Sequence, residues 1–148
     1  MNPMKMIDTI KESGLYELSN PTYIGILPND GGIIEGFPQA ILTYDEESFN
    51  IYTFSGYFKL KFDKKVYKYK FSDILEIEMG KYNFKENYIK IVFDDEKFIA
   101  FNYYKKVRKL ENQRGRIELF IKLLEQYSES EDKQRKIEEK HRPFIEDL

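Results

Sequence analysis

Few side chains in this sequence have the chemistry that catalysis requires. General acid-base catalysis near neutral pH most often uses histidine. The one histidine, His141, lies in a highly charged C-terminal stretch where nothing is expected to bury or orient it. The absence of cysteine excludes a thiolate nucleophile, a thiolate zinc site and a disulfide framework. We therefore predict that the protein is not an enzyme and uses no cofactor.

Two acidic runs, at residues 45–47 and 94–96, are the candidates for a cation site. Calcium takes six or more oxygen ligands arranged around a glycine-assisted turn, and neither run has that spacing. Each run lies between two apolar stretches, which is typical of the solvated turn of a β-hairpin. We predict two hairpin turns here and no metal site.

The pair Gly31-Gly32 is the candidate for a phosphate-binding loop. Such a loop needs a lysine and a helix that follows it. Here the chain continues with Ile33, Ile34 and a second Gly-Phe-Pro break at residues 36–38. The run at residues 28–32 therefore predicts a turn after a strand.

Lysines that alternate with tyrosine and phenylalanine through residues 57–71 are the candidates for a binding site. They are Lys59, Lys61, Lys64, Lys65, Lys68 and Lys70. Residues 59–109 carry a charge balance of +6, against −6 for residues 1–58 and −2 for residues 110–148. Basic strands with aromatic residues suit an anionic lipid surface, another phosphate-bearing ligand or single-stranded nucleic acid.

A structural interpretation of these lysines competes with the functional one. Like charges opposite each other on a sheet are destabilising, so a neighbouring strand is expected to insert carboxylates among them. Glu76 and Glu78 have the required period of two. Lysines on an exposed strand also discourage pairing between sheet edges. We favour this interpretation and keep anion binding as the alternative.

The elements that must position these residues are mainly strands. Residues 57–71 alternate apolar and charged side chains on both sides of Asp63-Lys64-Lys65, which predicts a half-buried antiparallel hairpin with its turn there. Further apolar runs predict strands at residues 23–27, 40–44, 49–54, 88–93 and 97–103. From Asn112 the period changes to that of an amphipathic helix with Ile117, Phe120, Ile121 and Leu124 on one face. The fold class is therefore mainly β with a C-terminal α-helix.

The chain divides into three parts on this interpretation. Residues 1–20 are an N-terminal segment, in which Pro3 to Lys11 has the features of a short helix. Residues 21–128 form the domain, and residues 129–148 are a charged extension that is either a solvated helix or disordered. No apolar run has the length of a signal peptide or of a spanning helix. We expect a cytoplasmic protein.

Two stretches carry a resemblance to a known family. Residues 23–28, Tyr-Ile-Gly-Ile-Leu-Pro, form an apolar strand punctuated by glycine and proline. Residues 69–78, Tyr-Lys-Phe-Ser-Asp-Ile-Leu-Glu-Ile-Glu, place Asp-Ile before a strand that ends in acids. Together with six or seven antiparallel strands and a closing helix, they make residues 23–127 similar to a pleckstrin-homology-like (PH-like) domain of the bacterial type. The resemblance implies a strongly bent, partly open antiparallel barrel of two sheets, capped by the helix.

The same resemblance implies no shared enzymatic activity. Some members bind phosphoinositides through basic loops, many bind proteins, and some bacterial ones build ring-shaped oligomers. The eukaryotic phosphoinositide signature, a lysine-rich first hairpin with an arginine near its end, is missing, because residues 1–58 hold only Lys5 and Lys11.

We therefore expect a non-catalytic protein-interaction module whose partner is another protein or a second copy of the chain. The alternative is peripheral binding to anionic lipid or phosphate-bearing ligands through residues 57–71. A membrane or a nucleic acid is the less favoured partner.

Overall fold

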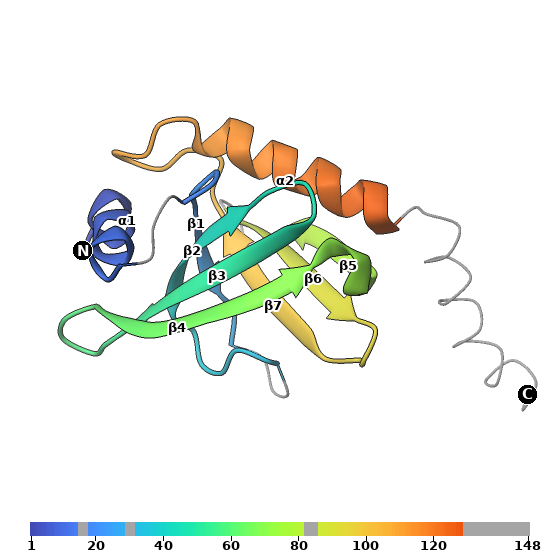
Figure 1. The fold of residues 1–148 in the computed structure, drawn as a ribbon, viewed down its shortest axis with the longest axis horizontal. Helices are drawn as coiled ribbons and strands as arrows, with labels where there is room; N and C mark the ends of the chain where they lie inside the picture. Colours follow the sequence, from blue (N-terminus) through green and yellow to red (C-terminus); the bar gives the residue numbers. More distant parts are fainter. Residues whose placement is uncertain (15–17, 29–31, 82–85, 129–148) are drawn as a thin grey trace, which may run out of the picture.

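The computed structural model describes residues 1–14, 18–28, 32–81 and 86–128. Within them, seven antiparallel strands form one sheet in the order β4-β3-β2-β1-β7-β6-β5 (Figure 1). The strands are β1 (Thr22–Ile26), β2 (Gln39–Tyr44), β3 (Ser48–Ser55), β4 (Lys61–Lys70), β5 (Ile74–Lys81), β6 (Asn87–Phe93) and β7 (Phe98–Tyr103). A 3-10 helix, η1 (Phe71–Asp73), joins β4 to β5, and the α-helices are α1 (Pro3–Glu12) and α2 (Gln113–Ser128).

The two edge strands, β4 and β5, are consecutive in sequence but do not pair with each other, so the sheet is not closed. β1 lies at its centre and pairs with both β2 and β7. The prediction of a mainly β fold with one C-terminal helix is confirmed. No described helix combines the length and the apolarity that crossing a bilayer requires.

Each face of the sheet packs against a helix. The larger core, here the α2-side core, joins buried residues of β1, β2, β3, β5, β6 and β7 to Ile117, Phe120 and Leu124 of α2. These three helical residues are buried as their spacing predicts, whereas Ile121 is only half-buried. The smaller α1-side core joins three residues of α1 to β2 and β3 on the other face. The sheet therefore has a buried core on each of its faces, under α2 on one and under α1 on the other.

The N-terminal segment belongs to the packed structure. The Asn2 side chain caps α1 by accepting a hydrogen bond of 3.0 Å from the backbone N–H of Lys5, and Pro3 occupies the first turn, where its missing N–H costs nothing. Met6, Ile7 and Ile10 are buried in the α1-side core. The predicted short helix is thus confirmed, and it covers a face of the sheet.

The start of α2 is fixed to β1 by a buried side chain that the sequence did not single out. Gln113 is 2% exposed. Its amide oxygen accepts a hydrogen bond from the backbone N–H of Tyr23 at 3.0 Å, and its amide nitrogen donates to the backbone carbonyls of Tyr23 and Tyr104 at 2.9 and 3.1 Å. These bonds hold the helix in a fixed position over the strands.

Residues 57–71 do not form the predicted hairpin. β4 is one continuous strand that pairs with β3, while Tyr57 and Phe58 lie in the loop that connects the two strands. The hairpin turn therefore lies at residues 56–60, several residues before the predicted turn at 63–65. The prediction was wrong because the break in the alternation at residues 63–65 was interpreted as the turn, whereas the chain turns before β4 begins.

The residues that were predicted to turn the chain are a bulge in β4. Between the pairs Phe54–Phe62 and Tyr52–Val66, β3 has one residue and β4 has three. Lys64, inside this stretch, has a φ of 56°, in the left-handed region. A bulge needs the same backbone irregularity as a turn, which explains why the local sequence predicted one.

Candidate functional site

The six lysines singled out in the sequence are all exposed, but they do not share one face of the sheet. Lys68 and Lys70 lie opposite Asn50 and Ser48 of β3, on the face of the α1-side core. Lys61 lies on the opposite face, because the strand alternates and its neighbour Phe62 packs on the α1-side core. The six lysines therefore do not form one surface on a single face of the sheet. The sheet register divides them.

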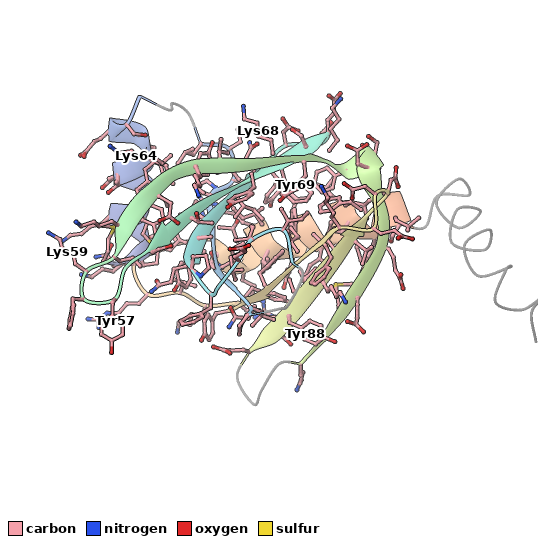
Figure 2. The ribbon with its side chains drawn as sticks, turned by 90° about the horizontal axis from the view of Figure 1, so that it is seen from below. Tyr57, Lys59, Lys64, Lys68, Tyr69 and Tyr88 are labelled. Carbon is pink, nitrogen blue, oxygen red and sulfur yellow. The ribbon has the colours of Figure 1, made fainter. Side chains whose placement is uncertain are left out.

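The lysines are also spread along the strand. Lys61 and Lys68 are paired with residues of β3 that are five positions apart, which corresponds to about 17 Å. Lys64 and Lys65 lie in the bulge, within about 7 Å of Lys61 along the strand, and Lys59 lies in the loop before it. The structure therefore places Lys59 and Lys61 at the end of β4 next to the β3–β4 loop, with Lys64 and Lys65 between them and Lys68. Figure 2 shows Lys59, Lys64 and Lys68 in this order along the hairpin.

Carboxylates are not inserted among these lysines by a neighbouring strand. Glu76 and Glu78, which were expected there, lie on β5 at the other edge of the sheet, opposite Val92 and Lys90 of β6. β4 pairs only with β3, and no residue of β3 in register with it is acidic. The expectation failed because strand order, which decides which strands are neighbours, cannot be read from a period of two.

The end of the hairpin carries two aromatic side chains that are almost fully exposed. Tyr57 and Phe58 are 93% and 97% exposed, and their rings meet edge to face at 4.8 Å. Lys59 follows them directly, and Leu60 packs against the α1-side core. We call residues 56–60 the hairpin tip. In Figure 2 Tyr57 and Lys59 point outward from it.

Gly56 makes this tight loop feasible. Its φ is +148°, a conformation that L side chains rarely adopt, and a Cβ atom at this position would lie 2.0 Å from the backbone oxygen of Lys59. The loop therefore folds back on itself at Gly56 and carries its aromatic pair outward. Its conformation comes from the backbone and does not depend on burial of Tyr57 or Phe58.

The base of the hairpin is held by a partly buried polar contact. The Asp63 carboxylate accepts hydrogen bonds from the hydroxyls of Thr53 at 2.7 Å and Ser55 at 2.8 Å. Thr53 is buried. Asp63, the one acidic residue of β4, is thus attached to β3, and the bulge that carries Lys64 and Lys65 is fixed across the hairpin.

The remaining sequence candidates have structural roles or lie outside the described residues. Residues 45–47 form the β2–β3 turn, where the Asp45 carboxylate accepts hydrogen bonds from the N–H groups of Glu47 and Ser48 at 2.8 Å, and these bonds lower its pKa. Residues 94–96 connect β6 to β7. In the part of the chain that is described, no group of three or more His, Cys, Asp or Glu is placed to hold a metal ion. Gly31, His141 and the extension at 129–148 lie outside it.

Comparison with known proteins supplies no family for this arrangement. No protein-family model matches the chain, and no curated protein matches its sequence.

Proposed function

We propose that this protein is a non-catalytic module of PH-like type that attaches to anionic lipid surfaces through the hairpin tip. Support for the fold family comes from the seven-stranded antiparallel sheet, which is not closed, and from the C-terminal helix packed on one of its faces. In this proposal the sheet corresponds to the bent, partly open barrel of two sheets, and α2 is the capping helix.

The observation that carries the lipid proposal is the composition of the tip. Large apolar side chains exposed together on a soluble domain often mark an interaction site. Aromatic side chains favour the boundary between water and a lipid bilayer, and lysines near an anionic leaflet are attracted to it. Tyr57 and Phe58 project from a loop that is flanked by Lys59 and Lys61. The failed expectation about Glu76 and Glu78 removes the main argument against this function.

The magnitudes favour weak, reversible binding that needs both kinds of residue. Full burial of Phe58 contributes about 1.5 to 3 kcal/mol, and a tyrosine ring inserted beside it contributes a comparable amount. Each lysine near an anionic surface contributes about 1 kcal/mol, so Lys59 and Lys61 next to the aromatic pair contribute about 2 kcal/mol together. Lys68 lies about 17 Å from Lys61 along the strand, beyond the Debye length of about 8 Å at physiological salt. Lys68 and Lys70 should therefore contribute little.

The test is sedimentation with vesicles of phosphatidylcholine, with and without phosphatidylserine. Binding should require phosphatidylserine, weaken as salt is raised, and fall at least tenfold in the double variants Y57S/F58S and K59E/K61E. The matched control is K68E/K70E, which makes the same charge change at the other end of β4 and should bind within about twofold of the parent.

A second test uses tryptophan fluorescence, because the chain has no tryptophan of its own. The variant F58W carries a single tryptophan, whose emission should shift to shorter wavelength when phosphatidylserine vesicles are added. M79W is the control, because Met79 is also partly exposed, at 39%, but lies on β5 at the other edge of the sheet. Equal shifts for both variants, or equal losses for K68E/K70E and K59E/K61E, would show that the tip is not the binding site.

A further inference from the structure

A groove lies between the C-terminal half of α2 and the turn that joins β2 to β3. Its volume is about 940 Å³. One wall is formed by Leu119, Leu123, Gln126 and Tyr127 of α2. The β2–β3 turn at 45–47 forms the other wall. The groove is at the opposite end of β3 from the hairpin tip.

The helical wall offers apolar surface. Leu119 is 46% exposed, although leucines on a domain helix normally face its core. Leu123 is half-buried and lies one helical turn further on, so the two side chains lie on the same side of α2. Leu119 is not part of the α2-side core, and Leu123 packs only against its margin, where it remains partly exposed to the groove.

The opposite wall is acidic. Asp45, Glu46 and Glu47 are exposed and line the groove. None of the described residues that line it is basic. The groove thus presents aliphatic side chains on one side and three carboxylates on the other.

Contacts within the protein fix the position of the two walls without an occupant. The Tyr127 hydroxyl donates to the Glu46 carbonyl at 3.2 Å, and the Tyr127 ring stacks on Phe71 at 5.3 Å. The Tyr44 hydroxyl donates to the Arg116 carbonyl of α2. At the floor, the Asn20 side chain donates to the Tyr44 carbonyl at 3.0 Å. A preformed groove binds with a smaller loss of conformational freedom than one that must open.

We propose that this groove binds a cationic amphipathic segment of a partner protein. Aliphatic side chains of the segment would pack on Leu119 and Leu123, as in the recognition of an amphipathic helix by an apolar groove. Its lysines or arginines would face Glu46 and Glu47. Charge complementarity of this kind selects the partner and its orientation more than it raises affinity, so an acidic amphipathic segment of the same shape should be rejected.

The experiment titrates the full chain into a fluorescently labelled synthetic peptide and follows anisotropy at physiological salt. The peptide is a helix former with leucines at helical spacing and lysines elsewhere. A second peptide replaces every lysine by glutamate. Saturable binding of the lysine peptide, at least tenfold tighter than that of the glutamate peptide, supports the proposal. Equal binding of both, or binding of neither, overturns it.

Variants locate the binding on the groove. E46K/E47K should weaken binding of the lysine peptide at least tenfold, and L119A at least threefold. Asp45 is left unchanged because it holds the turn. The control E125K reverses a charge at an exposed position of α2 outside the groove lining and should bind within twofold of the parent. A loss for E125K as large as that for E46K/E47K would overturn the assignment to the groove.

Two other occupants give distinct results. If the chain's own charged extension fills the groove, the full-length variant K133E/R135E/K136E should bind the lysine peptide at least tenfold more tightly than the parent. If a second copy fills it, sedimentation should show a dimer that E46K/E47K dissociates. Either result overturns the proposal of a separate partner. Amide chemical-shift changes confined to α2 and the β2–β3 turn on peptide addition would support it.

Discussion

Replacement of Phe120 by alanine tests whether α2 closes the main core. Phe120 is fully buried, and its ring lies 5.3 Å from the rings of Tyr44 and Phe49, 5.8 Å from Phe71 and 6.3 Å from Phe101. It therefore joins β2, β3, η1 and β7 to the helix. Phenylalanine-to-alanine changes in cores cost about 3 to 5 kcal/mol. Because four aromatic neighbours lose contact here, we expect a value in the upper part of that range.

The expected loss of unfolding free energy in F120A is a large part of the whole stability of a domain, which is about 5 to 15 kcal/mol. Urea unfolding followed by circular dichroism should give a midpoint well below that of the parent with a similar slope. The control is L119A, on the same helix but 46% exposed, which should cost less than about 1 kcal/mol. A loss below about 1.5 kcal/mol for F120A, or equal losses for the two variants, would mean that the helix does not close this core.

Three further results are expected. Gln113→Ala should destabilise by about 1 to 3 kcal/mol in urea unfolding, because it leaves partly buried backbone groups of Tyr23 without their partner; no loss would mean that water replaces the amide. Tyr69→Phe should cost less than Tyr44→Phe, since the buried Tyr69 hydroxyl has no hydrogen-bond partner among the described residues whereas that of Tyr44 donates to Arg116; the reverse order in melting temperature would contradict the described contacts. Burial raises the pKa of Tyr44 to about 12 and also raises the pKa values of Tyr23, Tyr69 and Tyr103 above 10.0, so the unfolded chain loses these protons first. The stability that these tyrosines contribute should therefore be constant well below pH 10 and fall as pH rises through it, and a melting temperature that holds steady between pH 10 and 12 would contradict this.

The strands and the helix were predictable where burial follows a simple period. In β2 and β3 the apolar runs of 40–44 and 49–54 predicted the strands to within one residue at each end. The helical spacing of Ile117, Phe120 and Leu124 predicted the buried side of α2. In these elements the local pattern and the final packing agree, which is why the sequence alone was informative.

The errors arose where pairing between distant residues decided the outcome. The bulge around Lys64 and a turn have the same local backbone irregularity, and only the register with β3 distinguishes them. The location of Glu76 and Glu78 depends on strand order. The structural role of Gln113 depends on the backbone of Tyr23, ninety positions earlier. One available signal was underused: Gly56, followed by Tyr-Phe-Lys, could have been interpreted as a tight loop with an exposed aromatic pair.

The two proposed surfaces are arranged so that they need not compete. β3 connects them: Ser55 leads into the hairpin tip and Ser48 follows the acidic turn that lines the groove, about 23 Å apart along the strand. In Figure 1 the β3–β4 loop and the β2–β3 turn lie at opposite ends of β3. This distance exceeds the Debye length of about 8 Å at physiological salt, so an anionic bilayer at the tip would not repel the carboxylates of the groove appreciably. The opposite charges also exclude exchange of ligands, because a cationic segment is repelled by the lysines at the tip and an anionic lipid by Glu46 and Glu47. A protein attached at the tip would therefore hold its groove open toward the aqueous side, where a basic segment of a partner can reach it.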